Sequence, residues 1–115
     1  VHEGPQSIRL NEVPTFLLPG MLTSNEPGVY KGGRHGIRTE NLTLVCKEKE
    51  TEFGEFYQFE TVTLCPIDKQ GILKEILSVD EINWFNEYHQ MVYNKLSPNL
   101  NEEEKQWLKE KTAAL

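Results

Sequence analysis

The chain has 115 residues, close to the usual size of one domain, and a formal net charge of −6 at pH 7. This charge argues against a nucleic-acid partner, because phosphates would be repelled and the basic residues are scattered along the chain. A mean hydropathy of −0.55, with no apolar run near the roughly 20 residues of a membrane span, argues against a membrane partner as well.

The first half of the chain is predicted to form strands separated by turns. Residues 1–10 are expected to end a strand and continue as irregular chain. Residues 21–26 and 36–46 are predicted strands, the second rich in Ile, Leu, Thr and Val. Residues 47–55 are charge-rich and expected as a surface turn, and residues 56–64 favour a further strand.

The second half is predicted to form two helices. Ser78 and Glu81 have the spacing of a capping box, and apolar residues follow at helical spacing until Ser97 and Pro98 end the element. Asn101 begins a second helix, whose three leading glutamates complement the positive end of its dipole. We therefore expect an α+β protein, with a strand-rich part at residues 1–68 and a helical part at residues 69–115.

Glu26 and Glu40 lie equally far from Gly33 in the sequence. If the chain folds back there as an antiparallel ladder, opposed residues share a constant sum of numbers, which pairs Glu26 with Glu40 and Leu22 with Leu44. Like charges opposed on a sheet, with Cβ atoms roughly 4.5–5.5 Å apart, repel and need a proton or a cation. The spacing leaves open a metal site or two solvated surface glutamates.

Three short motifs carry a resemblance to a known family. They are Val-His-Glu-Gly-Pro at residues 1–5, Ser-Asn-Glu-Pro-Gly at residues 24–28 and Gly-Ile-Arg-Thr-Glu-Asn at residues 36–41. In order and spacing, they resemble the C-terminal catalytic motifs of Xaa-Pro aminopeptidases of the aminopeptidase P type. The resemblance covers nearly the whole chain and implies the C-terminal portion of a pita-bread metallopeptidase fold, an antiparallel sheet with two C-terminal helices.

The resemblance implies roles for individual residues. Glu26 and Glu40 match the last two metal ligands of the family. His2 matches a histidine assigned to substrate contact and proton transfer. Arg38 and Tyr30 match residues that hydrogen-bond around the ligand carboxylates.

The resemblance also implies an activity. It is that of a cytoplasmic hydrolase that removes the N-terminal residue from peptides with proline in second position, using hydroxide held by two divalent ions, with manganese the expected metal. The family needs five protein ligands and only two match here, so we expect this piece to be inactive by itself. An uncovered sheet edge and apolar face lead us to expect a homo-oligomer.

Two other classes of function stay open. Some pita-bread domains have lost metal ligands and serve as peptide-binding modules without catalysis, and an unrelated acidic interaction domain would make the motif order a coincidence. His35, in the loop between the glutamates, is expected at the substrate entrance or as an ordinary loop residue. His89 is expected to be a packing or surface residue, because no acidic or histidine partner lies four residues away.

Overall fold

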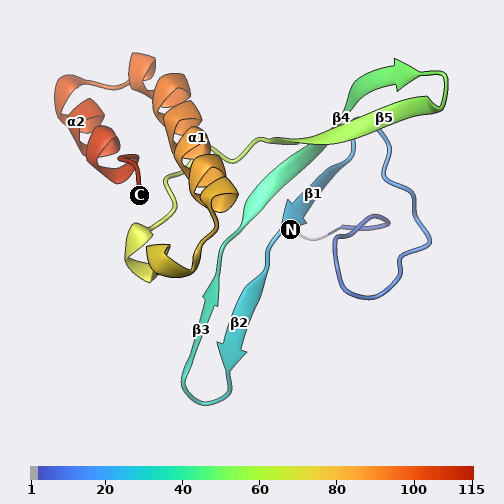
Figure 1. The fold of residues 1–115 in the computed structure, drawn as a ribbon, viewed down its shortest axis with the longest axis horizontal. Coiled ribbons are helices and arrows are strands. Elements are labelled where there is room, and N and C mark those ends of the chain that lie inside the picture. The colour runs from blue at the N-terminus through green and yellow to red at the C-terminus, as the bar shows by residue number, and fades with distance from the viewer. Residues whose placement is uncertain (1–2) are drawn as a thin grey trace. The chain divides into compact units, whose positions relative to one another are not determined.

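The structure is a computed structural model that describes residues 3–115, and its chain divides into two compact units, Val1–Thr63 and Leu64–Leu115. Strands build the first unit and helices the second (Figure 1), so the predicted α+β class is confirmed. No helix in the described part of the chain is long and apolar enough to cross a membrane.

A three-stranded antiparallel sheet forms the centre of the first unit. Its order is β1 (Leu22–Asn25), β4 (Asn41–Thr51) and β5 (Gly54–Thr61). Leu22 lies opposite Leu44, as the constant sum predicted. The buried residues of this sheet are Thr23, Asn41, Thr43 and Val45.

A two-stranded hairpin, β2 (Gly28–Lys31) and β3 (His35–Arg38), continues the register of the sheet. Its pairs have the same constant sum as the pairs between β1 and β4, so both ladders fold about Gly33. Gly33 has a φ of +67°, in the left-handed region that glycine adopts most readily. This common register brings the sequences before and after the hairpin together.

The predicted strand at 21–26 is found as β1, one residue shorter at each end, whereas the strand expected to run continuously over 36–46 is interrupted, which corrects that prediction. Breaks at residues 26–27 and 39–40 separate β1 from β2 and β3 from β4. Pro27 has no N–H to donate to the ladder, and here the amide of Thr39 donates to the carbonyl of Pro27 at 3.3 Å. The register survives the break while the regular pairing does not.

The turn predicted over residues 47–55 is confined to residues 52–53, although the whole range is exposed as expected. Strand β4 continues to Thr51, and β5 already begins at Gly54. Lys47 forms ion pairs with Glu50 and Glu55, and all of these side chains are exposed. A strand with both faces in water accepts charge at every position, so the charge-rich sequence did not exclude a strand.

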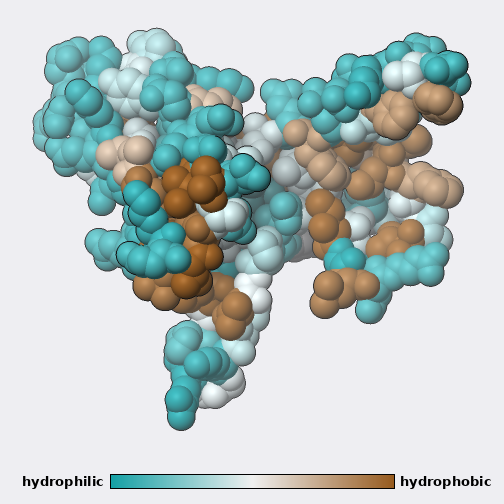
Figure 2. Space-filling view, viewed as in Figure 1, coloured by the Kyte–Doolittle hydropathy of each residue, from teal (hydrophilic) through white to brown (hydrophobic). Residues whose placement is uncertain are grey.

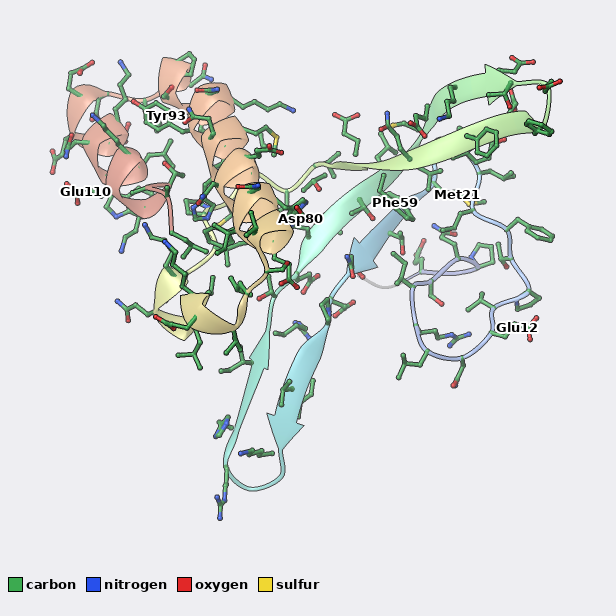
Figure 3. All side chains as sticks on the ribbon, viewed as in Figure 1. Glu12, Met21, Phe59, Asp80, Tyr93 and Glu110 are labelled. Atoms are coloured by element: carbon green, nitrogen blue, oxygen red, sulfur yellow. The ribbon has the colours of Figure 1, made fainter. Side chains whose placement is uncertain are left out.

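Some large apolar side chains of the β4–β5 ribbon remain exposed. Phe53, Phe56 and Phe59 are 84%, 42% and 50% exposed. Figure 2 shows brown patches among the charged residues of this ribbon, and Figure 3 shows Phe59 on β5. Such a surface is typical of a contact with another segment or chain.

Two capped helices form the second unit. Helix α1 (Val79–Leu96) has the predicted capping box of Ser78 and Glu81, and α2 (Glu102–Lys111) is capped by Asn101 together with Glu104. Short 3-10 segments cover Lys69–Gly71, Lys74–Ile76 and Ser97–Asn99. The core contains Tyr88, Val92 and Leu108, with Ile67, Met91, Tyr93, Leu96 and Leu100 packed against it.

His89 is completely buried on α1, which makes it a packing residue. Its Nε2 atom accepts a hydrogen bond from the amide of Ile67 at 3.0 Å, and its ring lies 4.2 Å from that of Phe85. Burial lowers the pKa of His89, and the positive charge of Lys69 lowers it further. The neutral imidazole therefore ties the segment before α1 to that helix.

Candidate metal centre

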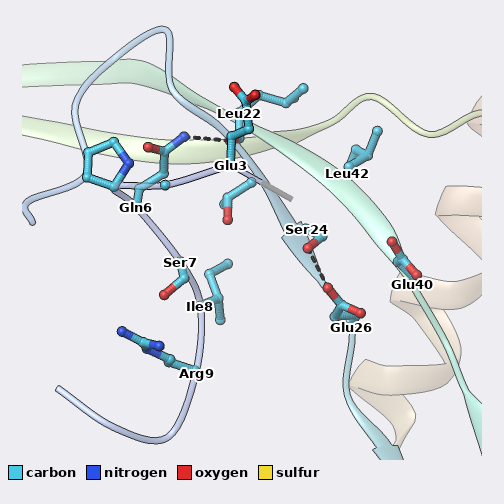
Figure 4. Close-up of a pocket in the computed structure, with 13 residues that line it drawn as sticks. Glu3, Gln6, Ser7, Ile8, Arg9, Leu22, Ser24, Glu26, Glu40 and Leu42 are labelled. Atoms are coloured by element: carbon cyan, nitrogen blue, oxygen red, sulfur yellow. Dashed lines mark hydrogen bonds between the residues drawn. The ribbon is translucent and has the colours of Figure 1, made fainter. Parts of the chain in front are cut away.

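Glu26 and Glu40 lie opposite each other at the break between the β1–β4 ladder and the β2–β3 ladder. Glu26 follows β1 and Glu40 precedes β4, so the turn at Gly33 brings them together. Both line a cavity of about 410 Å³, together with Leu22 and Leu42 (Figure 4). The register therefore places both carboxylates on one face, as predicted from sequence. The expectation that this face also carries the core is wrong, because Leu22 and Leu42 beside them are exposed and the buried Thr43 and Val45 lie on the other face.

Arg38 forms an ion pair with each of the two carboxylates. Its Nη1 atom lies 3.5 Å from Oε2 of Glu26, and its Nε atom lies 3.3 Å from Oε2 of Glu40. Ser24 donates a hydrogen bond of 2.7 Å to Oε1 of Glu26. One guanidinium charge thus faces two carboxylate charges, and the net negative charge that remains favours a further cation.

Tyr30 lies diagonally across the hairpin from Arg38, on the same face, and hydrogen-bonds to it. Its hydrogen bond with Arg38 is the largest cause of the raised pKa of that guanidinium, and the charges of Glu40 and Glu26 raise it further. An arginine is protonated at any working pH. The network therefore holds a permanent positive charge between the two glutamates.

The two predicted histidines are placed differently. His2 lies outside the described residues. His35 is the exposed first residue of β3, five positions from Glu40 and therefore roughly 16 Å away along the strand. Side chains alternate between the two faces of a ladder, and His35 is an odd number of residues from Glu40, so it lies on the face opposite the two glutamates. It does not line the described cavity. The roles of both histidines stay predictions.

Carboxylate oxygens are hard donors of the kind that suit manganese and magnesium. Glu26 and Glu40 therefore fit two positions in the ligand set of such ions. Among residues 3–115, however, no group of three or more His, Cys, Asp or Glu side chains could hold a metal ion. The pair fits two positions of a metal centre and does not complete one.

Sequence reasoning missed the contribution of the irregular chain at residues 3–9, which lines the same cavity. Gln6 donates from Nε2 to the carbonyl of Leu22 at 3.0 Å and so ties this segment to β1 (Figure 4). It also missed the contact of Tyr30 with Gly28 and Gly36. The constant-sum rule contained a signal for that contact, because it pairs Tyr30 with Gly36.

Comparison with known protein families identifies the class of this chain. Residues 55–115 match the family model described as the C-terminal region of peptidase_M24. The chain belongs to this family, and the resemblance seen in the motifs is confirmed.

Similar proteins extend the match beyond the family model. The chain is 43% identical to "Probable Xaa-Pro aminopeptidase P" of Coprinopsis cinerea, over all of the chain and 20% of that protein. It is 40% identical to "Xaa-Pro aminopeptidase 1" of Dictyostelium discoideum, over 95% of the chain and 18% of that protein. The chain thus spans about a fifth of the length of these relatives.

A solved structure has a similar fold. The X-prolyl aminopeptidase from Caenorhabditis elegans, described as a cytosolic enzyme with a di-nuclear active site, superimposes with a TM-score of 0.73. The match covers 86% of this chain and 17% of the nematode protein, at 30% sequence identity. The expected fold, the C-terminal portion of a pita-bread peptidase, is thereby confirmed.

Proposed function

We propose that this chain is the C-terminal part of the catalytic domain of an Xaa-Pro aminopeptidase, and that Glu26 and Glu40 are two of its metal ligands. The observation that carries the proposal is the opposed carboxylate pair, joined by Arg38 at the edge of a cavity. The names of the relatives and the di-nuclear site of the nematode enzyme support it. The substrates would be peptides with proline in second position.

The residues of the chain would divide the work as follows. Glu26 and Glu40 hold the two divalent ions, which when bound supply an activated water and a Lewis acid. Ser24 fixes one oxygen of Glu26, while Arg38 sets the separation of the two carboxylates and limits their repulsion. His2 contacts the substrate and carries a proton, and the cavity receives one end of the peptide.

Further properties belong to the same proposal. The metal is manganese, which suits carboxylate donors. The enzyme is cytoplasmic, like the nematode protein that is described as cytosolic. It forms a homo-oligomer, for which the exposed Phe53, Phe56 and Phe59 of the β4–β5 ribbon offer apolar surface. The 115-residue chain alone is inactive, because residues 3–115 contain no three-ligand group.

The test uses the whole protein that contains this chain. Glu26→Gln and Glu40→Gln keep the side-chain shape and remove the charge, so both should lower bound metal and reduce kcat/KM by about 10²-fold or more. Glu48→Gln, at an exposed position of β4, is the matched control and should change neither. Full metal content and full turnover in both site variants would contradict the proposal.

The same experiment addresses the peptide-binding alternative. A whole protein that binds proline-containing peptides without metal, and hydrolyses none with manganese present, would be a binding module and would overturn the enzymatic proposal. The intact carboxylate pair argues against this outcome, because two opposed like charges repel each other and peptide binding alone does not require such a pair beside Arg38.

A further inference from the structure

One face of the β2–β3 hairpin alternates glycine with a large side chain. Gly28 and Tyr30 occupy this face on β2, and Gly36 and Arg38 occupy it on β3. Across the ladder Tyr30 lies opposite Gly36, and Gly28 lies opposite Arg38. Each large residue therefore has a glycine as its neighbour across the strands.

The ring of Tyr30 lies directly over both glycines. A Cβ atom at Gly36 would be 2.5 Å from Cδ1 of Tyr30, and a Cβ atom at Gly28 would be 2.7 Å from its hydroxyl oxygen. The ring atoms nearest the backbone of Tyr30 therefore cover Gly36, and its hydroxyl end covers Gly28. A side chain at either position would lift the ring off the sheet.

Backbone conformation does not explain these two glycines. The glycines with positive φ in the described chain are Gly20, Gly33 and Gly54, so the backbone at Gly28 and Gly36 would accept other residues. Glycine inside a strand costs stability relative to residues with side chains. A close approach by another group is the usual reason for glycine there, and here the ring of Tyr30 is that group.

The position of the Tyr30 ring over the two glycines determines where its hydroxyl points. Because the hydroxyl end covers Gly28, it lies beside Arg38 on the opposite strand. Arg38 in turn contacts the carboxylates of Glu26 and Glu40. A continuous series of contacts thus leads from the two glycines to the carboxylate pair.

We propose that Gly28 and Gly36 are positioning residues, a platform without side chains that seats the ring of Tyr30 so that its hydroxyl holds Arg38 between Glu26 and Glu40. The inference rests on the proposed function in that it treats the two carboxylates as metal ligands. It adds that the metal affinity of the site depends on two residues that touch neither metal nor substrate.

Alanine substitutions in the whole protein test the platform. Gly36→Ala and Gly28→Ala should each weaken manganese binding by about 10- to 100-fold, the usual effect of disturbing the groups around a metal ligand. Their kcat should fall while KM changes little. Gly32→Ala is the matched control, because Gly32 lies in the same hairpin, has no positive φ and has nothing within 4 Å of an added Cβ atom. It should leave manganese binding unchanged.

A double-mutant cycle with Tyr30 separates positioning from general damage. In a Tyr30→Ala background the ring is gone, so Gly36→Ala should weaken manganese binding no further. Tyr30→Phe keeps the ring and removes the hydroxyl, and it should weaken binding as Tyr30→Ala does. Thermal unfolding of the metal-free variants shows whether each one folds.

The possible outcomes separate the two proposals. If Gly36→Ala weakens manganese binding equally with and without Tyr30, or not at all, the platform inference is wrong. If Gly36→Ala does not fold, the cycle of Gly28→Ala with Tyr30→Ala decides by the same criterion. Retention of metal by Glu26→Gln and Glu40→Gln would instead refute the proposed function itself.

Discussion

At the scale of single residues, the site depends on the fork of one guanidinium. Arg38 reaches Glu26 through Nη1 and Glu40 through Nε, which are different nitrogens of one planar group. Lysine has a single ammonium and cannot reproduce this geometry. We predict that Arg38→Lys in the whole protein lowers kcat/KM by about 10- to 100-fold. Arg34→Lys, at the exposed turn, is the control, and equal activity of both variants in a peptidase assay would contradict the bridging role.

A second residue-scale prediction concerns His89. Because its folded-state pKa is lowered, the unfolded chain binds more protons between the folded and unfolded pKa values, and stability rises with pH in that window. The helical unit should therefore lose stability as pH falls below about 6.5, until the lowered folded pKa is passed. His89→Gln keeps an acceptor for the amide of Ile67 and does not titrate. Urea midpoints measured from about pH 5 to pH 8 should show a weaker pH dependence in this variant, and identical slopes would refute the prediction.

At the scale of elements, the register was predictable and the side-chain network was not. One turn at Gly33 fixes every later pair of an antiparallel ladder, so the sequence placed Glu26 opposite Glu40. The break at residues 39–40 was overlooked, although it lies opposite Pro27, which has no N–H to donate to the ladder. The bond from the Ile67 amide to His89 joins residues 22 positions apart, and no local pattern reports such a contact.

The helix caps allow a prediction at this scale. The Ser78 side chain accepts from the amide of Glu81, and Glu81 accepts from the amide of Ser78 at 2.8 Å. Ser78→Ala should lower the free energy of unfolding by about 1 kcal/mol, and Ser78→Asp should restore most of it. Asn83→Ala, at an exposed position inside α1, is the control. Chemical denaturation that shows no difference between Ser78→Ala and the control would contradict the cap's contribution.

At the scale of the whole molecule, the proposed function makes Glu26 and Glu40 two ligands of a larger metal centre. We predict that the isolated 115-residue chain hydrolyses no Xaa-Pro peptide with manganese present, because two carboxylates cannot satisfy two ions. Its exposed apolar residues on the β4–β5 ribbon should make it self-associate. Light scattering that finds a monomer at high concentration, or measurable turnover, would contradict the respective part of this prediction.

The most direct measurement is the position of the metal in the whole protein. Crystals grown with manganese, recorded at the manganese absorption edge, should give two anomalous peaks roughly 3.5–4 Å apart. Carboxylate oxygens of both Glu26 and Glu40 should lie roughly 2.0–2.2 Å from these peaks, the usual length of a bond between a divalent metal and a carboxylate. Peaks held by other residues, with Glu26 and Glu40 bound to Arg38 alone, would contradict the account.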